Sequence, residues 1–390
     1  MSRYVLVLDV GTTTIKALIF DESYSVISKA VALPSKIKKE GGIVEQSPME
    51  LLKLSKNVIK EAVFLSKLNP KEIVSMGITN QRETVIAWDS ETGLPCYPAI
   101  VWEDTRTASY CKELDRHDEQ IKEKTGLRMD PYFSASKMHW LFKHPSTSTA
   151  FLNNTLRIGT VDSWILWNLS NEKSFFTDYT NASRTLLFSI KDLKWDRDLA
   201  HTFSIPMEVL AKTLPSVSEF GTLIPEILGV KIPINAICGD QQASHYGAGD
   251  SLWTTKATFG TGIFVSQTIG EEFKTYPGFF TTLLPHAKQP WYGVEVAIPN
   301  AGARMQLVLE NPERKLALVH EFAESVAKNV AKLPHEPHTL IIDGGITQAK
   351  ELAPTLARLT GLHIKTQKIT DGTALGVAKL LLGGENLSGV

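Results

Sequence analysis

The stretch that decides the fold is Gly77-Ile78-Thr79-Asn80-Gln81-Arg82-Glu83-Thr84, where an apolar run changes abruptly into hydrogen-bonding side chains. Residues 73–78 have the apolar, β-branched character of a buried strand. The polar side chains follow at the point where this strand ends. Because α/β proteins bind their ligands outside the carboxyl ends of strands, the pattern predicts a site at the edge of a sheet.

Two other places combine β-prone runs with a turn rich in glycine and threonine. Residues 4–9 lead through Gly11 and a run of three threonines into residues 15–20, and residues 257–265 repeat this layout. A weak internal duplication is the simplest interpretation. Glycine lets backbone amides approach an anion and threonine adds a hydroxyl donor, so such turns suit phosphate. One such turn alone is more often a plain β-hairpin, but here there are two, and Asp343-Gly344-Gly345 adds a third glycine turn after a strand.

Length and composition limit the class of protein. A chain of 390 residues exceeds one ordinary hydrophobic core, which indicates about two domains. Its 41 Lys and Arg against 42 Asp and Glu leave a net charge of −1, which argues against a nucleic-acid partner. Cys96, Cys111 and Cys238 fit neither a disulfide framework nor metal-ligand spacing. The short apolar run after Arg3 reads as a strand, so we expect no membrane insertion and a cytoplasmic protein.

Helix signals are clearest at Ser47-Pro48-Met49-Glu50. Ser47 can cap the helix, Pro48 suits its first turn, and Glu50 is placed to close a capping box. The apolar face predicted for this helix comprises Leu51, Leu54, Val58, Ala62 and Leu65. Further helices are expected over residues 241–246 and 350–359 and from residue 371.

Asp240 follows the apolar run of residues 234–238, in Gly239-Asp240-Gln241-Gln242. At a strand end it could accept a proton from a substrate hydroxyl, and an ordinary carboxylate suffices where phosphoryl transfer has a loose transition state. The alternative is an aspartate that caps the next helix. The motif alone leaves both interpretations open.

Arg82 and Glu83 form an adjacent donor and acceptor, as a polyol ligand requires. The alternative is a solvated hairpin tip. Trp102, Tyr132 and Phe264 could pack against the carbon atoms of a small polyol, or belong to the core.

Taken together, these segments resemble the glycerol kinases of the FGGY carbohydrate kinase family, in that family's order along the chain. The resemblance covers most of residues 1–270 and resumes near the C-terminus; it rests on residues 9–16, 77–107, 125–134, 159–162, 178–188, 239–242, 258–264 and 343–345. It implies an α/β, actin-like fold of two ribonuclease-H-like domains, an N-terminal one over residues 1–243 and a reduced C-terminal one over 244–390. It also implies phosphorylation of glycerol to sn-glycerol 3-phosphate, with ATP and Mg²⁺ in the cleft, and allows a homodimer.

The resemblance assigns roles by position, with Asp240 as the general base. The implied polyol contacts are Arg82, Glu83, Trp102, Tyr132, Asp240, Gln241 and Phe264. The implied phosphate and nucleotide contacts are Thr12, Thr13, Thr14, Lys16, Gly260, Thr261, Gly262, Gly302, Gln306, Gly344 and Gly345. Magnesium is expected at Asp9 and, through water, at Asp240.

The chain departs from that pattern in three places. Lys16 stands where glycerol kinases have arginine, and Ala349 where the family often has a polar residue. Between Glu310 and His320 a family segment of strands and a helix has no counterpart, so we expect a smaller second sheet and a more open nucleotide side. The alternatives are a kinase for another polyol or sugar, a degenerate kinase that binds ligand without turnover, and an actin- or chaperone-like ATPase. The run from Asn80 to Thr84 argues against the ATPase, which has no use for a polyol pocket.

Overall fold

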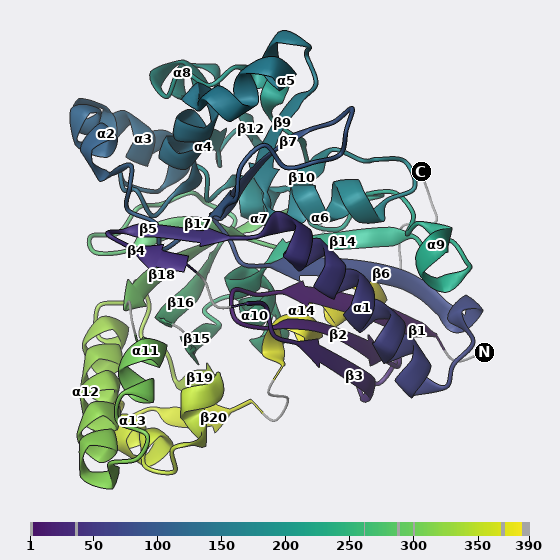
Figure 1. The fold of residues 1–390 in the computed structure, drawn as a ribbon. Helices are drawn as coiled ribbons and strands as arrows, with labels where there is room; N and C mark the ends of the chain where they lie inside the picture. Colours follow the sequence, from purple (N-terminus) through teal and green to yellow (C-terminus); the bar gives the residue numbers. More distant parts are fainter. Residues whose placement is uncertain are drawn as a thin grey trace. The chain divides into compact units, whose positions relative to one another are not determined.

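The computed structural model describes residues 3–35, 38–260, 262–286, 289–298, 301–367 and 371–383 (Figure 1). Contacts divide the chain into two units. Unit 1 comprises Met1–Asp240 and Val377–Val390, and unit 2 comprises Gln241–Gly376. The contact division falls close to the boundary expected at residue 243, but the chain from Val377 returns to unit 1 instead of staying with the second domain. One reason is close packing, since a Cβ on Gly77 would collide with Val377 Cγ1. The predicted domain limits themselves stay a prediction.

The main sheet of unit 1 has the strand order β14-β6-β1-β2-β3. Strands β14, β6 and β1 run parallel, whereas β2 and β3 are antiparallel additions. The carboxyl ends of β1, β6 and β14 therefore meet at one edge, as the polar run after residue 78 predicts. The strands are β1 (Tyr4–Val10), β2 (Ile15–Phe20), β3 (Val26–Ala32), β6 (Ile73–Asn80) and β14 (Ile234–Gly239).

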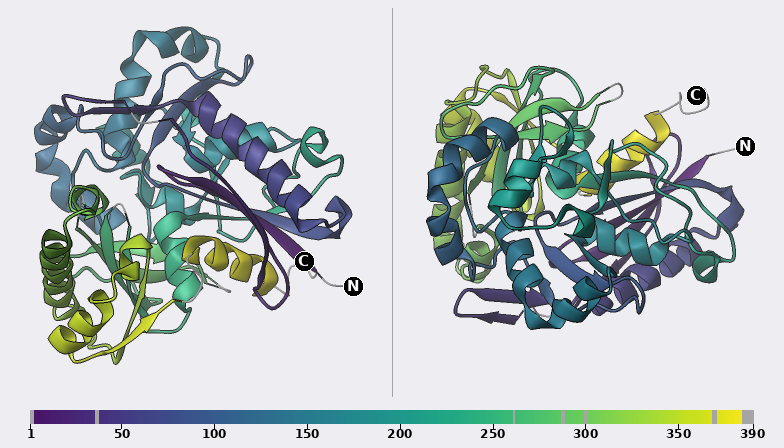
Figure 2. Two further views of the ribbon diagram at one scale, coloured as in Figure 1. Left: turned by 60° about the horizontal axis from the view of Figure 1, so that its bottom comes forward. Right: turned by 90° about the horizontal axis from the view of Figure 1, so that it is seen from above.

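Helix α1 (Pro48–Ser66) packs against β2 and β3 (Figure 2). Ser47 accepts a hydrogen bond from Glu50 N at 3.3 Å and Pro48 lies in the first turn, as predicted. The expected capping box does not close in this way: the Glu50 carboxylate instead accepts hydrogen bonds from the backbone and hydroxyl of Ser35. The predicted apolar face is buried at Leu51, Val58 and Ala62, but its last member, Leu65, is exposed, because the buried face of α1 also takes in Ile59 and Val63 and so leaves Leu65 at its margin.

A second sheet of unit 1, with the order β4-β5-β8-β7-β9, and several short helices complete that unit. The strands are β4 (Lys38–Glu40), β5 (Ile43–Gln46), β7 (Val85–Asp89), β8 (Ala99–Ile100), β9 (Leu156–Thr160) and the short pairs β10 (Phe176–Asp178) with β13 (Lys212–Leu214) and β11 (Phe188–Ser189) with β12 (Lys194–Trp195). The helices are α2 (Ala108–Glu113), α3 (Asp118–Thr125), α4 (Ser134–Lys143), α5 (Ser148–Leu152), α6 (Val161–Leu169), α7 (Tyr179–Ala182), α8 (Arg197–Thr202) and α9 (Pro225–Leu228).

The sheet of unit 2 repeats the pattern of the first, with the order β17-β18-β16-β15-β19-β20. Its β15 pairs antiparallel with β16 and parallel with β19, as β1 does with β2 and β6. The two sheets thus share the layout that the predicted internal duplication requires, and the duplication itself stays a prediction. The strands are β15 (Thr255–Phe259), β16 (Ile263–Gly270), β17 (Phe280–Leu284), β18 (Trp291–Ile298), β19 (Thr339–Asp343) and β20 (His363–Thr366). The helices are α10 (Asp240–Ala248), α11 (Ala301–Gln306), α12 (Pro312–Val330) and α13 (Leu352–Thr360). Helix α14 (Gly372–Gly383) begins in unit 2 and passes into unit 1 at Val377.

Each unit has its own buried apolar cluster. The cluster of unit 1 joins its sheet to α1 and α6, and that of unit 2 joins β15, β16 and β19 to α12 and α13. Cys96, Cys111 and Cys238 are free, as their spacing predicts. Within the described ranges, no helix is both long and apolar enough to cross a membrane.

Candidate active site

Three strand ends of unit 1 bring the predicted site residues to one edge of the sheet. Asp9 of β1 pairs with Thr79 of β6, and Asn80 pairs with Gly239 of β14. The chain after β6 is fixed by a hydrogen bond from Gln81 N to Val10 O at 2.9 Å. Asp240 directly follows β14 and opens α10, and the Gly239 amide before it donates to Thr180 Oγ1 at 2.8 Å.

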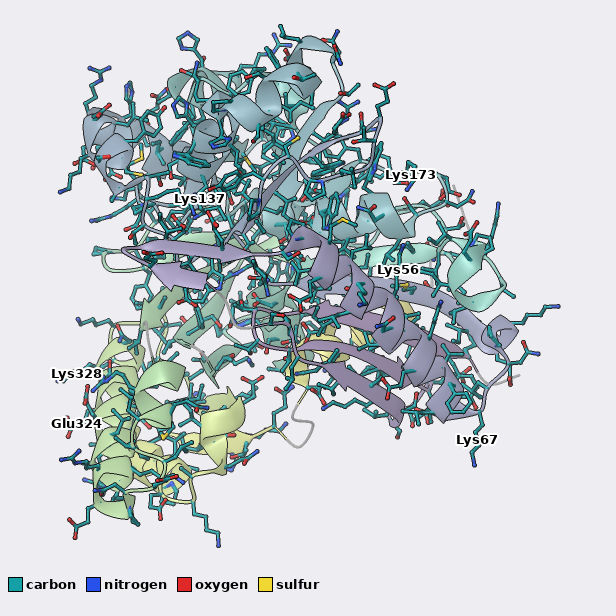
Figure 3. The ribbon with its side chains drawn as sticks, in the orientation of Figure 1. Lys56, Lys67, Lys137, Lys173, Glu324 and Lys328 are labelled. Atoms are coloured by element: carbon teal, nitrogen blue, oxygen red, sulfur yellow. The ribbon has the colours of Figure 1, made fainter. Side chains whose placement is uncertain are left out.

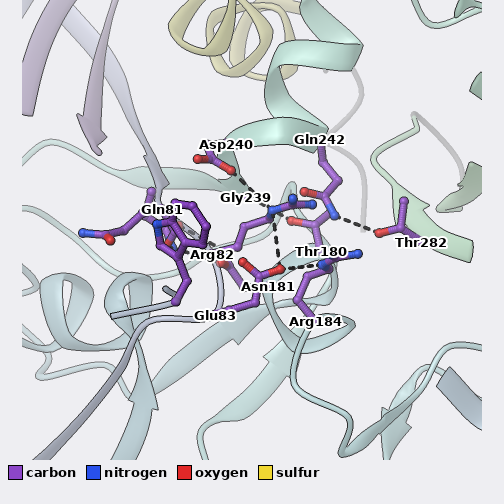
Figure 4. Close-up of polar contacts among 12 residues, drawn as sticks. Gln81, Arg82, Glu83, Thr180, Asn181, Arg184, Gly239, Asp240, Gln242 and Thr282 are labelled. Carbon is purple, nitrogen blue, oxygen red and sulfur yellow. Dashed lines mark hydrogen bonds and ion pairs between the residues drawn. The ribbon is translucent and has the colours of Figure 1, made fainter. Parts of the chain in front are cut away.

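A cluster of charged side chains lies at this edge (Figure 4). Arg82 Nε is 3.4 Å from Asp240 Oδ1 and 3.8 Å from Glu83 Oε1. Arg184 Nε donates to Glu83 Oε1 at 2.6 Å. Arg82, Glu83 and Arg184 are at most 2% exposed, which excludes the alternative of a solvated hairpin tip. The Asp240 side chain is 29% exposed and so remains accessible. Buried charges are costly unless paired, and these side chains supply each other's partners.

The backbone of Glu83 has an unusual conformation. Its φ is 61°, in the left-handed region that residues with a side chain rarely adopt. Ser134 Oγ donates to the Glu83 carbonyl at 3.1 Å while Arg184 holds the carboxylate. Strained residues of this kind persist only where the surroundings hold them, and they concentrate at functional sites. The direction of the Glu83 carboxylate is therefore fixed from both ends of the residue.

The polar segment from Asp178 to Thr185 is hydrogen-bonded to the end of β6, next to the charged cluster. Asn181 and Asn80 exchange two side-chain hydrogen bonds, at 2.9 and 3.1 Å. The fully buried Asp178 carboxylate accepts from the Asn181 amide and side chain, and burial raises the pKa of Asp178. These bonds connect the end of β6 to α7 and explain why so polar a segment is buried.

Two of the predicted aromatic residues lie beside the charged cluster. The rings of Trp102 and Tyr132 meet edge to face with their centroids 5.6 Å apart, and the Arg184 guanidinium lies 5.9 Å from the Tyr132 ring centroid. Both aromatic residues are half-buried. Phe264 belongs to β16 of unit 2, and its contact with a polyol stays a prediction. The same holds for Gln241, a half-buried residue of α10.

The first glycine and threonine turn joins β1 to β2. The Thr12 hydroxyl donates to Gln81 Oε1 at 3.0 Å and accepts from Trp102 Nε1 at 3.1 Å, so it links this turn to the aromatic wall. Thr13 is exposed and Thr14 half-buried. The contacts of Thr13 and Thr14 with phosphate stay predictions.

Asp9 and Lys16 form the charged pair of this turn, with Lys16 Nζ 3.9 Å from Asp9 Oδ2. Mg²⁺ favours carboxylate oxygens and usually shares its shell with water and substrate phosphates. No group of three or more possible metal ligands occurs among the described residues. Asp9 and Asp240 offer carboxylate oxygens of the kind that Mg²⁺ favours, and their role as its ligands stays a prediction.

The glycine turns of unit 2 differ in how much they tolerate a side chain. Gly344 has a φ of 95°, and a Cβ there would lie 2.9 Å from Phe259 N. A Cβ on Gly345 would meet nothing within 4 Å. The Gly260 amide donates to Gly262 O at 2.9 Å, which closes the second turn. Thr261 lies outside the described residues. Gly302 is half-buried and Gln306 exposed on α11.

A buried lysine joins three elements of unit 2 behind these turns. Lys256 Nζ donates to Asp343 Oδ1 at 2.7 Å and to Ser244 Oγ at 2.6 Å. It also donates to Thr258 Oγ1. Lys256 is 1% exposed and Asp343 5%. The pair thus fixes β15, β19 and α10 to each other at the end where the glycine turns begin.

Sequence reasoning missed Arg184, Lys137 and Lys256, three buried basic residues. Arg184 belongs to the polar segment that separates two apolar runs, and that position was the available signal. Lys256 is a charged residue within a strand of otherwise uncharged residues, which is a weaker signal. Lys137 is unremarkable in a helix, and only packing shows that it is buried.

Comparison with known proteins places these features among sugar kinases. The N-terminal domain of the FGGY family of carbohydrate kinases matches residues 4–247. A glycerol kinase from Alcanivorax borkumensis is 33% identical over 97% of this chain and 88% of its own length. One from Synechocystis sp. is 42% identical over 69% of this chain and 55% of its own. The chain also covers 65% and 62% of the glycerol kinases of Brachyspira hyodysenteriae and Pseudothermotoga lettingae, less than two thirds of each.

Among solved structures, the glycerol kinase of Plasmodium falciparum with ADP has a TM-score of 0.88 and 28% identity. The match covers 97% of this chain and 89% of that one. A xylulose kinase from Rhodospirillum rubrum has a TM-score of 0.85 at 16% identity, covering 100% of this chain and 91% of that one, and so shares the fold.

Proposed function

The chain belongs to the FGGY family of carbohydrate kinases, and on that premise we propose that it transfers the γ-phosphoryl group of ATP to a terminal hydroxyl of glycerol. The products are sn-glycerol 3-phosphate and ADP. The observation that carries this proposal is the buried cluster of Arg82, Glu83 and Arg184 next to the accessible Asp240. It offers a donor, an acceptor and a base at one edge of a sheet, and the related glycerol kinases favour glycerol as the polyol.

Binding of the polyol uses groups that are already in place. Each hydroxyl of glycerol donates one hydrogen bond and can also accept, so Arg82 serves as donor and Glu83 as acceptor. Because Arg184 and Ser134 hold Glu83, its carboxylate needs no reorganisation when the polyol binds. Trp102 and Tyr132 pack against the carbon atoms of the ligand, and their half-buried rings leave room for it.

Asp240 acts as the general base. The hydroxyl oxygen of glycerol forms a bond to the γ-phosphorus while the bond from that phosphorus to the β–γ bridging oxygen breaks, and ADP leaves. The hydroxyl proton passes to the Asp240 carboxylate. In a loose transition state this transfer occurs late, so position matters more than base strength. Arg82, 3.4 Å from Asp240, holds the carboxylate in the required direction.

The phosphate groups are assigned to the glycine and threonine turns. Thr12, Thr13, Thr14 and Lys16 serve in unit 1, and in unit 2 the assigned residues are Gly260, Thr261, Gly262, Gly302, Gln306, Gly344 and Gly345. Asp9, together with Asp240 through water, would hold Mg²⁺, which when bound neutralises charge on the phosphates. Support comes from the carboxylates of Asp9 near the end of β1 and of Asp240 directly after β14, and from Gly344, whose φ of 95° is one that glycine adopts readily.

The test is ADP release by the purified protein with Mg²⁺ and ATP, with and without glycerol and against a panel of other polyols and sugars. Glycerol-dependent release with formation of glycerol 3-phosphate is expected. A preference for another polyol would overturn the assignment of glycerol as the substrate. ADP release that does not depend on polyol would indicate an ATPase. Ligand binding without ADP release would indicate a degenerate kinase. Asp198→Asn, an exposed carboxylate in a surface ion pair, serves as a control that retains activity.

A further inference from the structure

Lys137 is a fully buried lysine near the polyol site that the mechanism does not use. It lies in α4 with 0% exposure, and Figure 3 shows it inside unit 1, whereas Lys67 projects from the surface. Its ammonium donates to the carbonyl oxygens of Pro131 and Tyr132, each at 2.7 Å. Lysine is almost never fully buried unless its charge has partners, so the position calls for a reason.

The place of this ammonium is locally unfavourable. The Cα–Cβ bonds of a helix tilt toward its N-terminus, so Lys137 in the first turn of α4 reaches back to the residues before the helix. A cation there opposes the helix dipole. Burial lowers the pKa of Lys137 to about 8. The two hydrogen bonds to the segment that carries Tyr132 offset part of the free-energy cost of burying this ammonium.

The two bonds fix the backbone on both sides of the Pro131–Tyr132 peptide. Tyr132 N in turn donates to Asp130 Oδ1 at 2.7 Å. With its amide and carbonyl both bound, Tyr132 has its ring directed against Trp102 and Phe133, at centroid distances of 5.6 and 5.2 Å. Lys137 thus holds the backbone from which this ring projects.

We propose that Lys137 is a positioning residue that fixes the Tyr132 ring as one wall of the polyol site and so sets the affinity for polyol without taking part in phosphoryl transfer. The inference rests on the proposed function, because it assigns Tyr132 to the polyol. It separates Lys137 from Asp240: loss of the first should weaken binding, and loss of the second should slow the reaction.

The first test is Lys137→Met, which keeps an unbranched side chain only one atom shorter and removes its charge and donors. We expect the KM for glycerol to rise about ten- to hundredfold, because hydrogen bonds from a charged group are lost. We expect kcat to change by less than about threefold and the KM for ATP by less than about twofold, as neither depends on Tyr132. An unchanged KM for glycerol, or a fall in kcat alone, would overturn the inference.

Lys143→Met is the matched control, since Lys143 ends the same helix with its side chain exposed, over the ring of Phe142. It should leave all three kinetic constants unchanged. A KM change as large as that of Lys137→Met would show that the effect is general to the helix and would contradict the inference.

A double-mutant cycle with Tyr132→Ala distinguishes positioning from general stability. If Lys137 acts through Tyr132, the double variant has the same KM for glycerol as Tyr132→Ala alone. Multiplication of the two single effects would mean that Lys137 acts by another route and would overturn the inference.

The wild type provides a measurement that needs no variant, should Lys137→Met fail to fold. Deprotonation weakens the bonds from the ammonium, so the KM for glycerol should rise as the pH passes through about 8, while the KM for ATP stays level. The groups that face the ammonium are the carboxylates of Glu83, Asp104 and Asp130 and the thiol of Cys111, whose pKa burial raises. A KM for glycerol that is constant from pH 7 to 9.5 would contradict the inference.

Failure of this inference is distinguishable from failure of the proposed function. A wild type that phosphorylates glycerol, with an unchanged KM in Lys137→Met, overturns only the role of Lys137. A wild type that phosphorylates no polyol overturns the proposed function, and the role of Lys137 in polyol binding with it.

Discussion

The two main sheets of the protein share one topology but carry different chemistry at their strand ends. Both place an antiparallel hairpin beside two parallel strands, as β1-β2 with β6 and β14 and as β15-β16 with β19 and β20. In unit 1 strand β6 is followed by Arg82 and Glu83, and in unit 2 the corresponding strand β19 is followed by Gly344 and Gly345. The same scaffold thus presents side-chain donors and acceptors at one edge and backbone at the other.

The difference matches two kinds of ligand. A small neutral polyol needs fixed donors and acceptors, which the side chains of Arg82 and Glu83 offer, whereas phosphate suits converging backbone amides. The buried charge of unit 2, the Lys256–Asp343 pair, lies behind its turns and holds their strands together. The predictions below test whether the charged residues at the strand ends of unit 1 act in catalysis, whereas the Lys256–Asp343 pair of unit 2 acts in stability.

The largest expected effect concerns Asp240, the proposed general base that follows β14 in unit 1. Asp240→Asn should lower kcat by about 10²- to 10⁴-fold, because the amide cannot accept the hydroxyl proton. Steady-state kinetics with glycerol and ATP measure it, beside Asp198→Asn as the control. Near-normal turnover in Asp240→Asn would remove Asp240 as the base.

The Lys256–Asp343 pair should matter mainly for the stability of the folded protein. Lys256→Met leaves Asp343 buried without its cation and should cost about 3–5 kcal/mol in the free energy of unfolding. Lys274→Met removes an exposed pair with Glu272 and should change the free energy of unfolding far less, because solvent screens an exposed ion pair. Urea denaturation of both variants measures the difference. Equal midpoints would show that the pair is not structurally important.

The two glycines after β19 offer an internal comparison. Gly344→Ala places a Cβ against the Phe259 backbone at a φ of 95°, and should destabilise the protein by about 1–3 kcal/mol. Gly345→Ala meets open space and should change stability little. Thermal unfolding of the two variants tests this. A similar loss in both would mean that the turn is constrained differently.

The smallest effect concerns a pH dependence in unit 1. Burial raises the pKa of Asp162 from 3.8 to about 7, although Thr160 and Thr177 donate to it. A raised pKa means that the folded protein holds this proton more tightly, so its contribution to stability is full below pH 3.8 and is lost as the pH rises through 7. Asp162→Asn should therefore lose less stability than the wild type between pH 5 and 7.5.

The midpoint of thermal unfolding at those two pH values measures this prediction, with Asp198→Asn as the exposed control. The same change in midpoint for the wild type and Asp162→Asn would show that Asp162 does not titrate in this range.

Local patterns in the sequence predicted most of the frame of the site. The structure has a strand that ends at Asn80, a turn shortly after Asp9 and glycines directly after the strand that ends at Asp343. These features could be predicted because apolar runs and turn residues are local signals. The resemblance to glycerol kinases predicted the actin-like, two-domain α/β fold, which the comparisons confirm. The reduced second domain, the homodimer and the cytoplasmic location stay predictions.

What the sequence did not predict depends on contacts between distant residues. Arg184 pairs with Glu83 across the unit, and Glu50 meets Ser35 and not its own helix start. Lys137 and Lys256 look like ordinary lysines until packing buries them. The Thr12 hydroxyl, predicted to face phosphate, bonds to Gln81 and Trp102, which the chain brings together only on folding.

The most direct test of the central claim is calorimetric titration of glycerol into the wild type, Arg82→Ala and Asp240→Asn. If the edge of the unit 1 sheet is the polyol site, Arg82→Ala should weaken binding by about ten- to hundredfold, because a bond from a buried charge is lost. Asp240→Asn should bind glycerol within a few-fold of the wild type while its turnover is lost. Unchanged binding in Arg82→Ala would contradict the account and place the polyol elsewhere.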